Sequence, residues 1–313
     1  EPRIDFSNDA KGALKLEPTK TNILPYSEDF TQWIGASYIT SNYAISPDGT
    51  LNASRLLFSG VGQEIKYNLT TSSSTSGSIY VKGISGENIR FGLEGSENNF
   101  TLNGNWQRLE VQGTETSNKI SLNTYGSVTA RDLSIYGAQV EESYATSYIP
   151  TQGSAVTRNQ DACNNVGNNQ VINSTEGVLY IETSALSNDL SERRFGISDG
   201  TSSNVVRVGY TSTSNRIIAV IYNGSNQAVL TYTSPDITQN SKIAVKYKAN
   251  DFALWVDGVE RSTDTNGSVF TANTLNSLSF NIGGGSHFYS ETKDVRVYNT
   301  ALTDAELQAL TSN

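Results

Sequence analysis

The sequence predicts an all-β protein made of two tandem β-sandwiches with a short helix at the C-terminus. Three observations lead to this prediction: the length, the composition and the alternation of apolar side chains. The chain has 313 residues, which at roughly 150 residues per domain corresponds to about two domains. Hydrophobic residues make up 36% and charged residues 17% of the chain, and 16 residues are Tyr. With abundant Gly, Ser, Thr and Asn, this mixture favours turns and half-buried strands over helices.

In the first half, apolar residues occupy every second position of several short segments. Each such segment predicts a strand with one buried face. Glycine-containing turns separate the segments, and this spacing is typical of a sandwich or barrel. The apolar sets are Ile79 and Val81; Ile89, Phe91 and Leu93; Leu109 and Val111; Ile120 and Leu122; and Leu133 and Ile135.

The alternation is lost between Gly137 and Val166, and it returns in the second half. We therefore expect a boundary near Arg158, with one domain over residues 1–158 and a second over residues 159–313. Asp-Gly and Asn-Gly pairs supply the reversals of the second sandwich. Its apolar sets include Val206 and Val208; Ile217, Ala219 and Ile221; Ile243, Val245 and Tyr247; and Leu254 and Val256.

The C-terminus departs from the strand pattern. Thr303 stands three residues before Glu306, which is the spacing of a capping box, and Leu302 and Leu307 occupy the positions of a hydrophobic staple. A short helix is predicted from Asp304 to about Leu310. We expect its apolar side to cover the end of the second sandwich.

Charge and residue counts exclude several classes of function. Lys and Arg total 22 and Asp and Glu total 31, so the formal net charge is −9, which disfavours binding to nucleic-acid phosphates. No apolar stretch approaches the ~20 residues that span a bilayer, so we expect a soluble protein without membrane insertion. One His and one Cys cannot form an internal disulfide or a Cys/His zinc site. Because the chain starts without a signal peptide and contains no Met, we expect a processed or cut piece.

Two segments of the second half carry a family resemblance. Residues 294–307 (DVRVYNTALTDAEL) resemble the closing strand and helix of concanavalin A-like, laminin G-like domains. Residues 252–258 (FALWVDG) are similar to a strand and turn of the same domains. The resemblance implies a concanavalin A-like sandwich from about Asn159 to the end, and it says little about the ligand.

The first half carries a different resemblance. Residues 2–6 (PRIDF), 16–18 (LEP) and 21–30 (TNILPYSEDF) with Trp33 resemble the opening of carbohydrate-binding-module-like jelly rolls of bacteriophage structural proteins. Residues 136–142 (YGAQVEE), 145–151 (ATSYIPT) and 155–158 (AVTR) are similar to the ending of these modules. The resemblance implies a protein of the virion surface or tail that recognises glycans of a host or of the environment.

Residues suited to sugar binding lie opposite in parity to the buried sets of the first domain. Sugars are held by flat aromatic faces and by polar side chains around their hydroxyls. The alternative is that Trp106 packs at the rim of the sandwich and that the tyrosines only cover strands. The candidate ligand-binding residues are Tyr80, Arg90, Trp106, Asn123 and Tyr125.

In the second domain, Trp255 is the first candidate. Leu254 and Val256 take the buried parity, so Trp255 is expected to face outward beside Asp257. An outward Trp indicates a ligand or another subunit. Replacing Trp255 or Tyr125 by Ala is therefore expected to leave folding intact while lowering attachment or assembly.

A glycine-rich loop of the second domain supplies two further candidates. His287 and Tyr289 lie in the segment 283–289, and loops over rigid sandwiches often carry binding residues. The alternative is a turn whose Phe288 tucks under the sheet. His287 has no Ser or Cys partner in its sequence context and is not expected to be catalytic.

A structural calcium is the one cofactor considered, and none is expected to be required. Jelly rolls of the resembled kind often hold calcium near their terminal strands, which would involve Asp132, with Glu28 or Asp29 as further ligands. Calcium takes six to eight oxygens. Solvated acids are the alternative.

These observations favour a protein that is not an enzyme. No strand carries the same-face carboxylates of concanavalin A-like glucanases, and neither a nucleophile elbow nor a phosphate-binding glycine loop is present. The leading hypothesis is a glycan-binding protein of a phage tail, head fibre or decoration, with polysaccharide and other virion proteins as partners. The alternatives are a purely structural virion component that forms a homo-oligomer, and a carbohydrate-binding appendage of a secreted bacterial polysaccharide-degrading enzyme.

Overall fold

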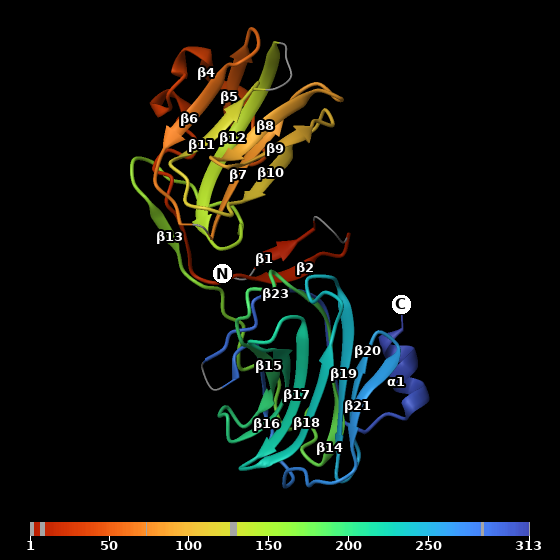
Figure 1. Cartoon of the computed structure of the whole chain (residues 1–313). Helices are drawn as coiled ribbons and strands as arrows, with labels where there is room; N and C mark the ends of the chain where they lie inside the picture. Colours follow the sequence, from red (N-terminus) through yellow and green to blue (C-terminus); the bar gives the residue numbers. More distant parts are fainter. Residues whose placement is uncertain (1–2, 7–9, 73, 126–129, 283–284, 313) are drawn as a thin grey trace. The chain divides into compact units, whose positions relative to one another are not determined.

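The computed structural model describes residues 3–6, 10–72, 74–125, 130–282 and 285–312. It confirms the all-β class, with strands in several sheets and a short α-helix near the C-terminus (Figure 1). The chain forms two compact units. We call Thr19–Asn159 the middle module, and residues 1–18 together with 160–313 the terminal module.

The middle module is a sandwich of two antiparallel sheets. A five-stranded sheet has the order β10-β7-β12-β5-β4, a four-stranded sheet has the order β6-β11-β8-β9, and β13 pairs with β3. Two 3-10 turns, η1 (Phe30–Gln32) and η2 (Ala36–Tyr38), precede β4. The strands are β3 (Lys20–Asn22), β4 (Ile39–Ile45), β5 (Leu51–Phe58), β6 (Glu64–Asn68), β7 (Thr75–Lys82), β8 (Asn88–Leu93), β9 (Ser96–Thr101), β10 (Gln107–Gln112), β11 (Lys119–Asn123), β12 (Arg131–Glu142) and β13 (Val156–Arg158).

The alternation read from the sequence determines which side of each strand enters this core. Ile79 and Val81 of β7 are fully buried, whereas Tyr80 between them is half-buried on the opposite face. Leu109 and Val111 of β10 are likewise buried, and Glu110 between them is exposed. All five predicted apolar sets of the first half belong to one hydrophobic core. Each strand therefore presents every second side chain to the outer face of its sheet.

The terminal module is also a two-sheet sandwich. Its sheets have the orders β1-β2-β23-β14-β19-β20-β21 and β18-β17-β16-β15-β22, and residues of both sheets form its main core. The strands are β1 (Arg3–Asp5), β2 (Ala13–Leu16), β14 (Glu176–Ala185), β15 (Arg193–Ser198), β16 (Asn204–Tyr210), β17 (Arg216–Asn223), β18 (Asn226–Thr233), β19 (Ser241–Lys248), β20 (Phe252–Val256), β21 (Val259–Asp264), β22 (Ser277–Ser279) and β23 (Ser290–Tyr298).

The first strands of the chain differ from the sequence-based expectation. Residues 1–18 are expected in the first domain, but β2 pairs with β23 of the terminal module. Leu16 is buried in the core of that module. Two hydrogen-bonded neighbours and a buried Leu outweigh closeness in sequence, so the chain begins in the terminal module, forms the middle module and then returns.

The C-terminal helix α1 (Asp304–Thr311) has the predicted capping box between Thr303 and Glu306. It lies against β19 and β20 on the outer face of the seven-stranded sheet rather than at the end of the sandwich (Figure 1). There Leu307 is fully buried, in one cluster with Trp255. None of the helices in the described part of the chain is long and apolar enough to cross a membrane.

We predict that Leu307→Ala destabilises the terminal module. The side chain is fully buried against the sheet, and truncating a buried Leu costs about 2–4 kcal/mol. Gln308→Ala, at the exposed neighbouring position, is the control and should change stability by less than about 0.5 kcal/mol. Urea denaturation of both variants measures the difference, and equal midpoints would contradict the placement of α1.

Candidate functional site

Three tyrosine rings gather on the outer face of the five-stranded sheet of the middle module. Tyr80 comes from β7, Tyr136 from β12, and Tyr148 from the loop after β12. The ring centroids of Tyr136 and Tyr148 are 5.4 Å apart, and those of Tyr80 lie 6.2 Å from Tyr136 and 6.4 Å from Tyr148. Because these rings lie outside the module's hydrophobic core, we call this surface the tyrosine face.

A glycine makes this arrangement possible. The register of β12 against β7 shifts between Tyr136 and Gln139, and Gly137 within this bulge has a φ of 61°. A Cβ atom at Gly137 would lie 3.2 Å from the rings of both Tyr148 and Tyr80. The bulge thus re-aims the strand, and the missing side chain leaves room for the packed rings.

Two carboxylates approach the hydroxyl groups of these rings. The Tyr136 hydroxyl lies 2.9 Å from Oδ2 of Asp48 and 3.2 Å from Oε1 of Glu28. The Tyr148 hydroxyl lies 2.9 Å from the same oxygen of Glu28 and 2.7 Å from Oγ of Ser27. Burial raises the pKa of both tyrosines, and the nearby carboxylates raise it further. Both phenols therefore remain protonated and act as donors.

Asp48 is held in place by the turn between β4 and β5. Its Oδ1 accepts from the hydroxyl of Ser46 and from both the amide and the hydroxyl of Thr50, each at 2.7 Å. Asn52 donates to Oδ2 at 3.0 Å. Hydrogen bonds from Ser46 and Thr50 hold the pKa of Asp48 well below its usual value, because donors favour the ionised form. Asp48 is thus a fixed negative charge beside the Tyr136 hydroxyl.

Trp106 and Arg108 border the tyrosine face. The Arg108 guanidinium lies 5.7 Å from the centroid of the Tyr80 ring and donates to Oγ of Ser78. The indole Nε1 of half-buried Trp106 donates to the carbonyl of Ile45 at 3.2 Å. Trp106 precedes β10 and Ile45 ends β4, which are the two edge strands of this sheet. The β4–β5 hairpin therefore folds over the outer face and brings Asp48 to Tyr136.

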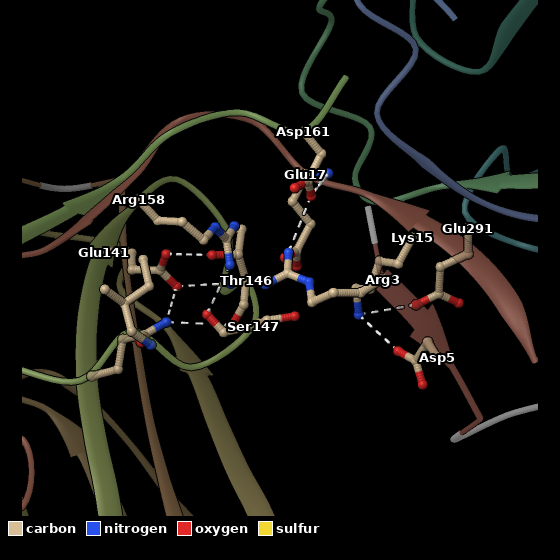
Figure 2. A network of polar contacts seen from close by, with 12 residues as sticks. Arg3, Asp5, Lys15, Glu17, Glu141, Thr146, Ser147, Arg158, Asp161 and Glu291 are labelled. Atoms are coloured by element: carbon tan, nitrogen blue, oxygen red, sulfur yellow. Dashed lines mark hydrogen bonds and ion pairs between the residues drawn. The ribbon is translucent and has the colours of Figure 1, made fainter. Parts of the chain in front are cut away.

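A buried carboxylate anchors the loop that carries Tyr148. Glu141 is 1% exposed, and it accepts from the amide of Thr146 at 2.7 Å and from the Thr146 hydroxyl at 2.5 Å. Arg158 donates to the carbonyl of Ser147 at 3.2 Å, and Figure 2 shows these contacts around the loop. The same figure includes a polar network of the terminal module, in which Arg3 pairs with Glu17 and Asp161. Both networks serve to fix backbone segments.

The other candidates of the middle module do not join this face. Arg90 belongs to β8 of the four-stranded sheet and pairs with Glu97 at 3.5 Å. Asn123 was expected to face outward, but it is 1% exposed, and its side-chain oxygen accepts from the amide of Tyr125. Tyr125 is 44% exposed. The sequence-based parity was correct for the strands, but the strands belong to two separate sheets.

In the terminal module, Trp255 is not available to a ligand. Its side chain points away from the main core, as the alternation predicts. However, α1 covers the side chain, and only 7% of the residue is exposed. The expectation of an outward, exposed Trp is therefore wrong, because the helix packs on that side of the sheet. Asp257, half-buried at a φ of 50°, accepts from the amide of Lys242 at 2.9 Å and shapes the β20–β21 turn.

The segment around His287 brings two predicted residues together. The rings of His287 and Tyr289 stack with centroids 5.6 Å apart. The Gln160 side chain lies 3.1 Å from Nε2 of His287 and accepts from the Tyr289 hydroxyl at 2.7 Å. Phe288 between them is buried, as the alternative reading expected. Gly283 and Gly284 of this loop lie outside the described residues.

The predicted calcium ligands have other partners. Asp132 forms a two-point ion pair with Arg55, at 2.8 and 2.6 Å, and Asp29 accepts from the amide of Thr31 at the start of η1. Among the described residues, no group of three or more His, Cys, Asp or Glu side chains could hold a metal ion. Calcium binding stays a prediction.

The site also contains residues that the sequence reasoning did not select for ligand binding. Asp48 was not considered, and Glu28 was considered only for calcium. Tyr136 and Tyr148 served only to mark the family resemblance. The clustering of Ser46, Asp48 and Thr50 in a turn was a readable local signal, but it did not indicate that the turn folds over the sheet.

Comparison with known proteins assigns the fold of the terminal module. Residues 182–308, somewhat less than half of the chain, match the family model described as the concanavalin A-like lectin/glucanases superfamily, of laminin G type. The terminal module is thus a concanavalin A-like domain. No curated protein matches the chain.

Several solved structures are similar at low identity. The CBM40 domain of a Ruminococcus gnavus sialidase, bound to α2,3-sialyllactose, is 15% identical, with a TM-score of 0.38; the match covers 49% of this chain and 97% of that one. A leech intramolecular trans-sialidase is 18% identical, with a TM-score of 0.36; the match covers 48% of this chain and only 27% of that one. Domains LG4-5 of the mouse laminin α1 chain are 9% identical, with a TM-score of 0.32, and the match covers 80% and 88%.

We predict that Asp48 makes the stability of the middle module dependent on acidic pH. Its pKa in the folded protein lies below the ordinary value of 3.8, so its stabilising contribution is present above about pH 4 and is lost as the pH falls through the lower, folded pKa. The stability difference between the native protein and Asp48→Asn should therefore shrink as the pH is lowered below about 4.

Thermal denaturation across this pH range measures the effect. Glu142→Gln is the control, because Glu142 is exposed and its carboxylate has no hydrogen bond among the described residues. A stability difference between the native protein and Asp48→Asn that does not change with pH would contradict the role assigned to the turn.

Proposed function

We propose that this protein is a non-catalytic glycan-binding protein and that the tyrosine face is its binding site. The observation that carries the proposal is that half-buried Tyr80 and Tyr148 meet the carboxylates of Glu28 and Asp48 on one sheet face, with buried Tyr136, 5% exposed, packed against both rings. Aromatic faces can pack against the C–H surfaces of a sugar, and carboxylates can accept from its hydroxyls. The concanavalin A-like class of the terminal module is compatible with the same function.

The geometry is better suited to binding than to hydrolysis. A pair of neighbouring carboxylates is also what a glycosidase uses for catalysis. In a glycosidase the two carboxyl groups lie on either side of the scissile bond, roughly 5 to 10 Å apart. Here both lie within hydrogen-bonding distance of the single Tyr136 hydroxyl, so they share one side. Asp48 is held ionised by its turn and is therefore unsuited to act as a general acid.

We propose the surface of a bacteriophage particle as the setting, with attachment to host or environmental polysaccharide as the role. A single sugar site binds weakly, with a Kd of about 1 mM to 1 µM. Many copies on one particle would raise the effective affinity by ~10² to 10⁴. A carbohydrate-binding appendage of a polysaccharide-degrading enzyme is the alternative setting, and a longer parent chain with a catalytic domain would select it.

A purely structural virion component is the other alternative, and it has lost its main support. That hypothesis has aromatic patches burying against sister subunits, and one of the rings considered for this, Trp255, is buried by α1 of the same chain. Light scattering of the purified protein still tests it. A stable oligomer that binds no glycan would favour the structural role.

We predict that Trp106→Ala weakens glycan binding about tenfold, which corresponds to about 1.4 kcal/mol. Trp106 borders the tyrosine face, whereas Tyr125 extends from the four-stranded sheet. Tyr125→Ala is therefore expected to bind as the native protein does. A glycan array of bacterial surface polysaccharides identifies the ligand, and calorimetry on that ligand compares the variants. No binding by a folded sample would overturn the proposal, and loss of binding in Tyr125→Ala alone would move the site to the other sheet.

We also predict that no bound glycan is cleaved. Prolonged incubation with each ligand found on the array, followed by chromatography of the products, should return intact oligosaccharide. New reducing ends that disappear in Glu28→Gln would show that the two carboxylates are catalytic.

A further inference from the structure

We propose that the tyrosine face selects glycans that carry protonated amino groups and discriminates against acidic sugars. The inference rests on the glycan-binding function proposed above and adds the chemical class of the ligand. It follows from an imbalance between acceptors and donors around Glu28 and Asp48, and from the fact that neither carboxylate forms an ion pair in the described part of the chain.

The phenols cannot satisfy both carboxylates. A tyrosine hydroxyl has one proton to donate, yet Tyr136 lies within hydrogen-bonding distance of Asp48 and of Glu28. Its shorter contact is with Asp48, at 2.9 Å against 3.2 Å. The Tyr148 proton is likewise shared between Glu28 and Ser27, with the shorter contact to Ser27. Two phenol protons therefore serve three acceptors, namely Asp48, Glu28 and Ser27.

Ser27 does not relieve this shortage. Its hydroxyl points to the carbonyl of Thr151 at 3.2 Å, and its oxygen lies 2.8 Å from the amide of Thr151. The Ser27 proton is thus used within the buried Ser27–Thr151 contact. Glu28 and Asp48 thus share the phenol protons with Ser27, and Glu28 keeps acceptor sites for donors from outside the protein.

The charges around the face have the sign that favours a cationic ligand. Within the described residues, neither Glu28 nor Asp48 has an ion pair with Lys or Arg. The cations on this sheet face include Arg108, which pairs with Glu110 at 3.0 Å, Arg55, which pairs with Asp132 at 2.6 Å, and exposed Lys82, two positions after Tyr80 on β7. The carboxylates of Glu28, Asp48, Glu110 and Asp132 outnumber these cations. The local field is therefore negative. A carboxylated sugar would be repelled, whereas an ammonium group brings a positive charge and three donors.

The test compares three oligosaccharides of equal length by calorimetry near neutral pH: glucosamine, N-acetylglucosamine and galacturonic acid oligomers. The glucosamine oligomer should bind at least about tenfold more tightly than its acetylated counterpart, and the galacturonate oligomer should not bind. The double variant Glu28→Gln, Asp48→Asn should abolish the preference for the amine. The control is Glu115→Gln, Glu142→Gln, which removes the same charge at two exposed positions of the middle module and should keep the preference.

The outcomes separate this inference from the proposed function. Equal binding of the acetylated oligomer, or binding of the galacturonate oligomer, would overturn the inference and leave glycan binding intact. A preference that both double variants lose equally would show attraction by the net negative charge alone, which also overturns it. If none of the three oligomers binds, the inference is overturned. The proposed function fails as well only if no polysaccharide on the array binds either.

Discussion

Each strand of a β-sandwich sends alternate side chains into the core, and what covers the other half decides which surfaces remain available for binding. Both modules illustrate this constraint. In the terminal module, Trp255 points away from the main core, and Leu307 of α1 packs on it. In the middle module, Tyr80 points away from the core in the same manner, but the rings of Tyr136 and Tyr148 and the Arg108 guanidinium lie next to it in place of a helix. One sheet face is thus closed by a helix, and the other is left half-open.

The strands and the C-terminal helix could be predicted from the sequence because their determinants are local. Alternation specifies the buried side of β7 and β10, and the capping box between Thr303 and Glu306 marks the start of α1. The site depends on contacts between residues far apart in the chain. Glu28 and Tyr136 are 108 positions apart and Asp48 and Tyr136 are 88 positions apart. No periodic pattern encodes such convergence, so only Tyr80 and the bordering Trp106 were found in advance.

The two main errors have the same physical origin. The alternation along a strand predicts that a side chain points away from the core, but it does not predict whether another element covers that side chain. For Trp255 the covering element is a helix that begins 49 residues later, and for Asn123 the turn itself buries the side chain. The placement of β1 and β2 was missed for a related reason, since pairing of β2 with β23 joins opposite ends of the chain.

The tyrosine face is ordered before any ligand arrives, and this affects how a weak ligand can be selected. The loop that carries Tyr148 is fixed by buried Glu141 and by the Ser27–Thr151 contact, and the turn that carries Asp48 is fixed by its own donors. A ligand therefore need not order these segments, which would otherwise reduce its affinity. Because these donors hold Asp48, its charge stays beside the Tyr136 hydroxyl when a ligand binds. A rigid site with an unsatisfied acceptor penalises an acidic ligand as well as stabilising a basic one, and such a difference between two ligands is what selectivity requires.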